Sequence, residues 1–362
     1  MKATFKWLFF ECIVRNNIFV KFLLFPFSLI YGGVTWCRNK FYDLGFFASY
    51  NIPIKSIVVG NLAVGGTGKT PHVAFLLDYL ASTFKVVVLS RGYGRTTKGF
   101  LNCTEYLNAN LTGDEPFMYV SRYSQNENIT VNVCEDRWLG VTKSISEFSP
   151  DVIILDDAFQ HRRVKPGLAI VLSDYNTPFF EDRMLPAGNL REYSSGLKRA
   201  DILIFTKCPD NLTDFEKKKM LNKVTSFEGA VFFSKILYGD AILFNGSKII
   251  DLENYSILLV TGIANPTPLA TYLQKCVSLE LIQFPDHHAF SSSDIQKIHA
   301  KFDVLQSNKK IIVTTEKDYM RLKAFENLTE SDGYLWCYIT IDVKLDREKE
   351  FLKVLNSYVR SV

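Results

Sequence analysis

The stretch GNLAVGGTGKTP at residues 60–71 decides the fold. A glycine-rich turn that ends in Lys69-Thr70 is typical of a phosphate-binding loop, whose usual pattern is G-x-x-x-x-G-K-[ST]. The first glycine of that pattern is replaced here by Ala63. A small side chain is compatible with this position if the backbone φ is negative, because only a positive φ demands glycine.

The segments on either side provide the context that such a loop requires. Residues 54–61 (IKSIVVGN) are a β-branched run, and residues 71–83 (PHVAFLLDYLAST) carry apolar side chains at helical spacing. Strand, glycine loop and helix together predict a nucleotide site, in which backbone N–H groups and the helix N-terminus bind phosphate. Lys69 is expected to reach the β- and γ-phosphates, and the Thr70 hydroxyl to bind Mg²⁺. The residues expected to bind nucleotide are Gly65, Gly66, Thr67, Gly68, Lys69 and Thr70.

Further apolar runs alternate with helical stretches after this loop. Strands are expected at residues 85–90 (KVVVLS), 151–157 (DVIILDD), 167–174 (GLAIVLSD) and 200–208 (ADILIFTKC). This alternation predicts a mostly parallel sheet with helices on both faces. We therefore expect an α/β fold built on a P-loop NTPase core of the RecA-like type.

The pattern changes near residues 230–250. The runs AVFFSKILYG and AILFNGSKII predict two short antiparallel strands around Gly239-Asp240, and a second α/β series follows them. The expected division is an N-terminal helix (1–45), a P-loop core (46–228), a two-stranded β-hairpin linker (229–252) and a smaller α/β domain (253–362).

A second chemical element is DVIILDDAFQHRR at residues 151–163. An apolar strand that runs into an acidic residue is typical of a Walker B strand, whose Asp holds Mg²⁺ or its water. Asp156 and Asp157 are therefore expected to bind the metal, and the sequence does not divide the role between them. The run IFTKCPD (204–210) resembles a guanine-recognition motif, but Pro209 occupies the place of its Asp. An ordinary strand end is the better interpretation there.

Composition places the chain among globular proteins, with 47% hydrophobic and 22% charged residues in 362. The seven cysteines are scattered singly, which argues against a disulfide framework or a zinc site and suits a reducing cytosol. The whole net charge of +4 is carried by residues 1–50, where six basic residues face two acidic ones. A nucleic-acid partner is not expected.

That N-terminal segment is also rich in aromatic and aliphatic side chains. From Phe22 to Trp36 the apolar run is 15 residues, interrupted by Pro26, whereas a spanning helix needs about 20. Basic residues on both sides fit a cleaved signal peptide poorly. A buried core helix remains the alternative. We favour a helix that lies in the membrane interface, where its basic residues meet anionic lipid.

Several stretches together resemble one family, the tetraacyldisaccharide 4′-kinases, or lipid A 4′-kinases. They occur in family order from about residue 25 to 322, and a small residue in place of the first loop glycine is a family feature. The stretches are FPFSLIYGGVTWCRNKFYD, VGNLAVGGTGKTP, LSRGYGR, GDEP, LDDAFQHRR, LPAGNLRE, TGIANP, FPDHHAF and TTEKDYMRL.

The resemblance implies ATP- and Mg²⁺-dependent phosphorylation of the 4′-hydroxyl of a lipid A disaccharide precursor. It also implies a kinase on the cytoplasmic face of the inner membrane, which we expect to act as a monomer on an acylated glucosamine disaccharide. By family pattern, Asp114 of GDEP is the general base, His287 of FPDHHAF assists it, and Lys69 acts on the phosphates. Around substrate and phosphates the pattern further places Asn61, Arg91, Tyr93, Glu115, Arg137, Gln160 and Arg191.

Two other interpretations of the residues stay open. One is a membrane-attached P-loop switch or chaperone, which the imperfect guanine motif and the additional FPDHHAF segment disfavour. The other is a degenerate nucleotide-binding scaffold, which the intact Lys69, Thr70 and Asp157 disfavour. Phosphate transfer to an acceptor lipid separates the kinase from both.

Overall fold

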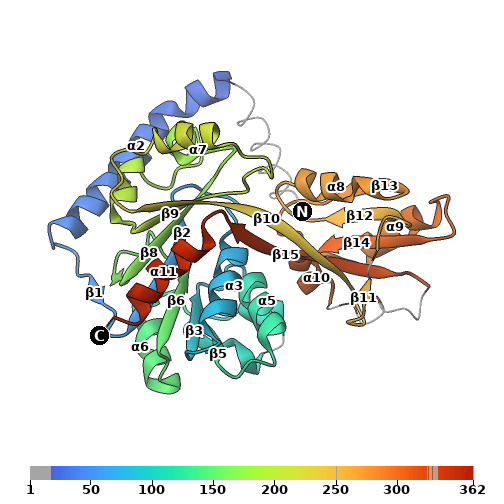
Figure 1. The fold of residues 1–362 in the computed structure, drawn as a ribbon, viewed down its shortest axis with the longest axis horizontal. Helices are drawn as coiled ribbons and strands as arrows, with labels where there is room; N and C mark the ends of the chain where they lie inside the picture. Colours follow the sequence, from blue (N-terminus) through green and yellow to red (C-terminus); the bar gives the residue numbers. More distant parts are fainter. Residues whose placement is uncertain are drawn as a thin grey trace.

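The computed structural model describes residues 18–361, except 107, 250, 324, 326–327 and 329–332. Figure 1 shows a larger and a smaller α/β unit side by side, joined by two long strands. One twisted sheet runs through both units. Its strands in spatial order are β13 (Ser278–Gln283), β12 (Ser256–Thr261), β14 (Lys310–Thr315), β15 (Trp336–Leu345), β10 (Ala230–Leu243), β9 (Ile202–Thr206), β8 (Leu168–Asp174), β2 (Lys55–Asn61), β6 (Val152–Asp156), β3 (Val86–Ser90), β5 (Ile129–Val133) and β4 (Leu101–Asn102).

The remaining elements complete the two units. β11 (Lys248–Ile249) pairs with β10, and β1 (Tyr50–Asn51) pairs with β7 (Val164–Lys165). The α-helices are α2 (Ile18–Asp43), α3 (Lys69–Leu80), α4 (Ala109–Thr112), α5 (Asp114–Tyr123), α6 (Arg137–Phe148), α7 (Asp214–Leu221), α8 (Thr267–Tyr272), α9 (Ser292–Asp303), α10 (Glu316–Leu322) and α11 (Glu348–Val359). Short 3-10 helices are η1 (Cys103–Glu105), η2 (Phe179–Glu181), η3 (Ser194–Arg199) and η4 (Leu273–Lys275).

The expected parallel sheet with helices on both faces is confirmed. β2, β3, β6, β8 and β9 pair in parallel, and alternate residues of β2 enter opposite cores. Ile57 and Val59 pack with α3, α5 and α11, while Val58 packs on the other face with α6. The period of two along a strand explains why a run buried on both faces is continuously apolar.

The hairpin expected around Gly239-Asp240 is not what the structure contains. β10 runs through these residues as one strand, with a bulge between Tyr238 and Ala241, and turns only near Gly246, where φ is +89°. Around Gly239-Asp240 its antiparallel partner is β15, about 100 residues further along the chain, whereas β11 pairs only with Ala241 and Ile242. The sequence signal for a local turn was therefore a bulge, because a distant strand supplies the hydrogen bonds that a hairpin would have supplied.

The last helix lies with the larger unit, although the expected division assigns its residues to the smaller one. Phe351, Leu355 and Val359 of α11 are buried in the same core as Ile57 and Val59. The Tyr358 hydroxyl also bonds the backbone N–H and C=O of Ser56, at 2.9 and 3.0 Å. Figure 1 shows α11, in red, lying against the strands of the larger unit.

Helix α2 continues through Pro26 and both following glycines for 26 residues. By length and composition it could cross a membrane, yet one side docks along the larger unit. Ser28 Oγ accepts from the Ala187 N–H at 2.9 Å, and Asn39 donates to Glu192 at 2.9 Å. The spacing of these contacts defines one helix face. The opposite face exposes Phe19, Phe22, Leu23, Ile30 and Val34 by 64–77%.

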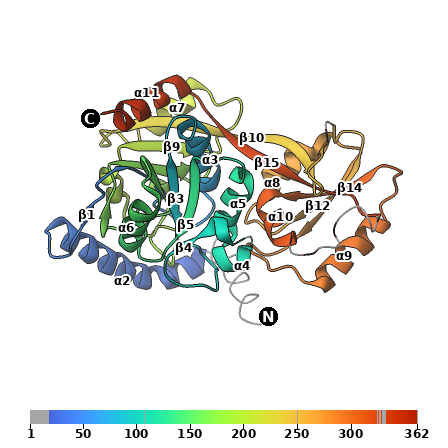
Figure 2. The same ribbon diagram turned by 90° about the horizontal axis from the view of Figure 1, so that it is seen from below.

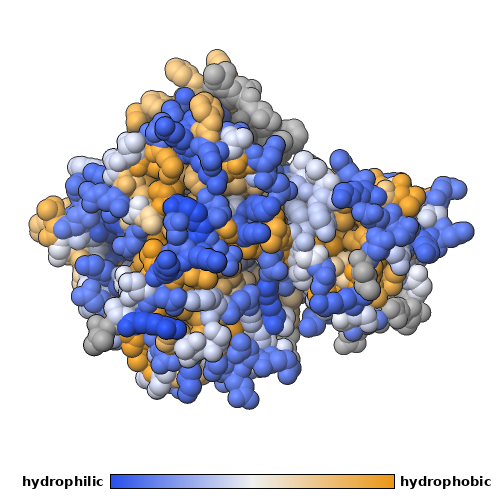
Figure 3. Space-filling view, in the orientation of Figure 1, coloured by the Kyte–Doolittle hydropathy of each residue, from blue (hydrophilic) through white to orange (hydrophobic). Residues whose placement is uncertain are grey.

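Figure 2 shows α2 along the lower margin of the larger unit, and Figure 3 shows hydrophobic side chains on the surface where α2 lies. The basic residues Lys2, Lys6 and Arg15 of the expected membrane segment lie outside the described residues. The N-terminal apolar helix is thus confirmed, with one docked and one exposed side.

We predict that Leu355→Ala lowers the free energy of unfolding by about 2–5 kcal/mol, because it empties a fully buried position beneath α11. Val354→Ala, at a neighbouring position that is 37% exposed, should change it by about 0.5 kcal/mol or less. Urea denaturation of the full chain measures both values. Equal effects would show that α11 does not contribute to this core.

Candidate active site

The phosphate-binding loop joins β2 to α3, which begins at Lys69. Gly65 and Gly68 have φ of +107° and +85°, in the region that favours glycine. Ala63 is not among the residues of positive φ, and it forms a bridge with Leu190 instead. The loop therefore keeps glycine where the backbone requires it, and the replacement of the first glycine introduces no strain.

Hydrogen bonds from polar side chains hold the phosphate-binding loop in place. The Asn61 amide donates to Thr67 Oγ1 at 3.0 Å, and the Thr206 hydroxyl donates to the Thr67 carbonyl at 2.8 Å. Gln160 donates to the Asn61 carbonyl at 2.7 Å and to Glu192 at 2.9 Å. Asn61 is fully buried. These contacts fix the path of the loop.

Asp157 lies just beyond β6 in a left-handed conformation, with φ of +48°. Its carboxylate accepts a hydrogen bond from Arg191 Nη1 at 3.0 Å and lies 3.7 Å from the Lys69 ammonium. Burial alone would raise the pKa of Asp157, but Lys69 and Arg191 outweigh it and lower that pKa. Asp157 is thus an ionised carboxylate that forms an ion pair with Lys69 of the loop.

Asp156, the last residue of β6, is in the opposite situation. It is completely buried, and the Tyr119 hydroxyl donates to its Oδ2 at 3.3 Å. Burial, with Glu115 and Asp157 nearby, raises the pKa of Asp156 despite the opposing charge of Lys69. Within the described part of the chain its Oδ1 has no hydrogen-bond partner.

These features fit a divalent cation. A buried carboxylate oxygen without a partner, close to other carboxylates, is stabilised by positive charge. The described residues contain no group of three or more His, Cys, Asp or Glu side chains that could hold a metal by themselves. Mg²⁺ is usually held by one or two carboxylates together with phosphate oxygens, and Asp156 and Asp157 offer such carboxylates. Thr70, Asp156 and Asp157 are the residues that would hold it.

Arg137 begins α6 close to these aspartates and is only 3% exposed. Its guanidinium donates to the Cys134 carbonyl at 2.8 Å. Burial lowers the pKa of Arg137 to about 10, although Asp156 and Asp157 act in the other direction. Arg91, which is exposed, adds to the lowering and so lies within electrostatic range. The structure therefore brings the two arginines and the two aspartates into one neighbourhood.

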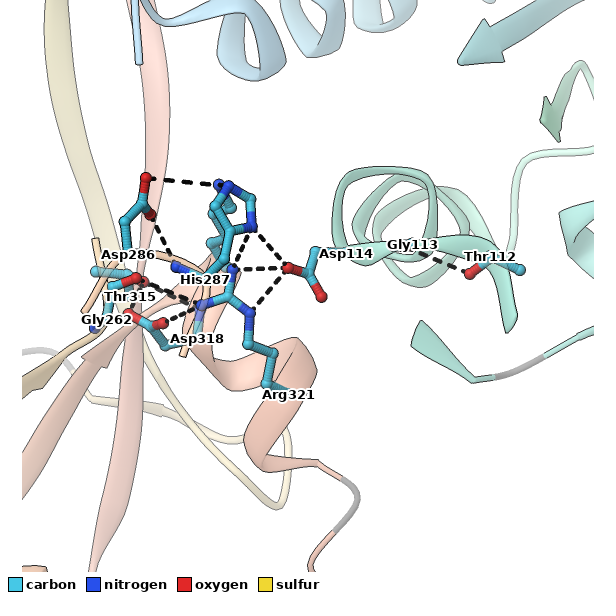
Figure 4. A network of polar contacts seen from close by, with 10 residues as sticks. Thr112, Gly113, Asp114, Gly262, Asp286, His287, Thr315, Asp318 and Arg321 are labelled. Carbon is cyan, nitrogen blue, oxygen red and sulfur yellow. Dashed lines mark hydrogen bonds and ion pairs between the residues drawn. The ribbon is translucent and has the colours of Figure 1, made fainter. Parts of the chain in front are cut away.

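The predicted base and its histidine come from different units and meet (Figure 4). Asp114 is the first residue of α5, whereas His287 follows β13 with φ of +58°. Asp114 Oδ2 lies 3.2 Å from His287 Nδ1. The exposed Tyr93 ring lies 5.7 Å from the imidazole, edge to face. Residues that are 173 positions apart thus form one acid–base pair.

Two residues of α10 complete this cluster, and the sequence interpretation had not singled them out. Arg321 donates to Asp114 Oδ2 through Nε at 2.9 Å and Nη2 at 2.7 Å, and its Nη1 bonds Asp318 at 2.9 Å. Lys317 Nζ lies 3.1 Å from His287 Nε2. Both belong to the stretch TTEKDYMRL, whose acid and bases at helical spacing were the available signal.

These partners set the protonation state of Asp114. Burial has the largest single effect and would raise its pKa, but the hydrogen bonds and charges of His287 and Arg321 together outweigh it and lower the pKa to about 2. The carboxylate is therefore ionised at neutral pH. Its neighbour Glu115 contributes to the raised pKa of Asp156, which places the start of α5 beside the nucleotide loop.

A phosphate-binding loop followed by a helix, with two aspartates at the end of a neighbouring strand, defines the P-loop class of phosphotransferases. Residues 20–360 match the model of the Tetraacyldisaccharide-1-P 4'-kinase family. The chain belongs to this family.

Individual relatives agree over almost the whole length. A tetraacyldisaccharide 4'-kinase of Flavobacterium psychrophilum is 39% identical, with 95% of this chain and 98% of that protein covered. The one from Bacteroides thetaiotaomicron is 39% identical, with 93% of each covered. The solved structure of "apo" form LpxK from Aquifex aeolicus in complex with ATP has a TM-score of 0.71 at 30% identity, covering 94% of this chain and 99% of that one.

We predict that Gly68→Ala lowers the free energy of unfolding by about 1–2 kcal/mol, because an L side chain is strained at a φ of +85°. Gly66→Ala is the matched control, since φ there is not positive and a Cβ would meet nothing within 4 Å. It should change stability by about 0.5 kcal/mol or less. Chemical denaturation without nucleotide compares the two, and equal losses would contradict the backbone assignment.

Proposed function

We propose that this chain transfers the γ-phosphoryl group of ATP to the 4′-hydroxyl of a tetraacyldisaccharide 1-phosphate, in lipid A biosynthesis, and that Asp114 is its general base. The observation that supports this role most directly is the contact of Asp114 with His287 across the two units. A switch that only hydrolyses nucleotide needs no acid–base pair from a second unit.

The proposed phosphoryl transfer uses the charged groups of the site. The Asp114 carboxylate orients the sugar hydroxyl and takes its proton while the hydroxyl oxygen bonds to the γ-phosphorus and the bond to ADP breaks. Lys69 and the N–H groups of the loop bind the phosphates. Mg²⁺, when bound, neutralises the charge of the β- and γ-phosphates. Thr70, Asp156 and Asp157 are the residues that would hold it.

For the other residues that match the family pattern, we propose roles from the groups that each one contacts or lies near. Arg91, Tyr93 and Arg137 lie near the carboxylates or the imidazole and are proposed to contact substrate or phosphate. Arg191 and Gln160 act through Asp157 and Asn61, and the fully buried Asn61 supports the loop from within. Glu115 adds negative charge beside Asp156, which favours binding of a cation.

We also propose that α2 holds the enzyme, as a monomer, on the cytoplasmic face of the inner membrane. Its exposed apolar side is opposite the side that docks on the larger unit. A helix docked along its length can bury that side in the interface while the catalytic unit stays in water. An acylated substrate in the same leaflet then reaches the site from the membrane.

The function is tested by incubating detergent-stabilised full chain with γ-labelled ATP, Mg²⁺ and tetraacyldisaccharide 1-phosphate. We expect label in a lipid product phosphorylated at the 4′-position, in equal amount to the ADP formed. Nucleotide hydrolysis without labelled lipid, or stimulation by GTP and a protein partner instead, would support the P-loop switch and overturn the kinase.

We predict that Asp114→Asn lowers kcat for lipid phosphorylation by about 10²–10⁴-fold, because the amide cannot accept the hydroxyl proton. The affinity for ATP should stay within about twofold, since the described contacts of Asp114 go to His287 and Arg321 and not to the loop. Asp210→Asn, whose side chain is 85% exposed, is the control. Near-native turnover in the Asp114 variant would remove the base assignment and leave the family intact.

We predict that Arg321→Met shifts the acid limb of the kcat–pH profile to higher pH. Without the guanidinium, burial dominates and the pKa of Asp114 rises from about 2, so the base is protonated at a pH where the native enzyme still works. Activity at pH 5 relative to pH 8 should therefore fall more in the variant. Arg122→Met is the control, because it removes a different ion pair, the one between Arg122 of α5 and Asp342 of β15. It should leave the kcat–pH profile unchanged. Identical profiles for all three proteins would refute the electrostatic role.

A further inference from the structure

The imidazole of His287 is held between an acid on one ring nitrogen and an ammonium on the other. Nδ1 lies 3.2 Å from Asp114 Oδ2, and Nε2 lies 3.1 Å from Lys317 Nζ. His287 is 37% exposed at its side chain, so these contacts rather than burial fix the ring. Figure 4 shows the ring between the two units with Asp114 on one side.

The donor and acceptor inventory allows one protonation pattern for these contacts. An ammonium has three donors and no lone pair, so the Nε2 that it approaches must be an acceptor. An imidazolium has no acceptor, and a neutral imidazole has one donor and one acceptor. These two contacts together are satisfied by a ring with one proton, carried on Nδ1, whose N–H would donate to Asp114 Oδ2.

Of the other groups around the ring, Arg321 offers a contact that competes with this pattern and Asp286 lies too far away to alter it. Arg321 Nη2 approaches Nδ1 at 3.1 Å, but it lies 2.7 Å from Asp114 Oδ2, so both nitrogens donate to the same carboxylate oxygen. Asp286 Oδ2 is 4.0 Å from Nε2, which is too far for a hydrogen bond. The charged and titratable groups that face the imidazole are thus Asp114 from α5, Lys317 and Arg321 from α10, Asp286 from its own loop and Tyr93.

We propose that Lys317 is a positioning residue that holds His287 as the neutral Nδ1–H tautomer, so that the ring orients Asp114 instead of competing for its proton. This deepens the kinase mechanism proposed above and rests on it. In the described residues, the contacts from His287 and Arg321 all go to Oδ2 of Asp114. Oδ1 is then the oxygen that accepts the sugar hydroxyl. An imidazole turned to the other tautomer, or protonated, could not make the same pair of contacts.

The tautomer is measured directly by NMR of full-length protein labelled with ¹⁵N-histidine, in detergent at neutral pH. The chain has five histidines, and His287→Gln assigns the signals of His287. We expect a protonated Nδ1 and an unprotonated Nε2 in the native protein. In Lys317→Met we expect the Nε2–H tautomer or the imidazolium to become populated. A native Nε2–H tautomer, or a Lys317→Met spectrum identical to the native one, would overturn the proposal.

The kinetic constants of Lys317 variants provide a second test. A purely structural role of Lys317 would not lower kcat while leaving KM for ATP unchanged. Lys317→Met should lower kcat about tenfold or more with KM for ATP nearly unchanged, because acid–base groups act on the transition state. Lys317→Arg, which keeps a cationic donor, should restore most of kcat. Lys323→Met removes an exposed lysine from the end of the same helix and should match the native enzyme. Equal losses in the Met and Arg variants would contradict a donor role.

Failure of this proposal is distinguishable from failure of the proposed function. If the native protein phosphorylates the lipid but His287 carries its proton on Nε2, only the role of Lys317 is wrong. If the native protein transfers no phosphate, the kinase assignment fails whatever the tautomer. Near-ultraviolet circular dichroism of each variant, compared with the Lys323→Met control, confirms that the fold is kept.

Discussion

The antiparallel pairing of β10 with β15 is the constraint on which the rest of the structure depends. β10 starts in parallel with β9 in the larger unit and then pairs with β15 from Ser234 to Leu243. β15 in turn pairs with β14 of the smaller unit. Because a sheet is stiff along its hydrogen-bonded strands, this pair fixes where the smaller unit stands. The loop with His287 and the helix with Arg321 are thereby carried to the start of α5.

Electrostatics then divide the site into two parts of different character. Around the loop, buried carboxylates lie close to positively charged side chains. The pKa of Asp156 is raised there, whereas the pKa of Asp157 is lowered. At α5, Asp114 is kept ionised by partners from the other unit. The protonation states of these carboxylates thus differ because their environments differ.

Much of this could be predicted from residues close together in the sequence. The strand–loop–helix order around Gly65 and Gly68 is local, because each glycine meets a backbone requirement set by its neighbours. Asp156 and Asp157 follow an apolar strand for the same local reason. The hairpin at Gly239-Asp240 was wrong, because whether two residues form a turn or a bulge depends on which strand pairs with them, and that strand is remote.

The sequence by itself determined the nucleotide loop, the parallel sheet and, through its family resemblance, Asp114 and His287. The tertiary structure alone decided that Arg321 and Lys317 flank that pair, that α11 belongs to the larger unit's core and that Asn61 is buried beneath the loop. The physical reason is distance along the chain. Local backbone geometry and hydrophobic period are encoded by neighbouring residues. The partners of a side chain are instead decided by packing between distant segments, as with Arg321 and Asp114, which are 207 residues apart.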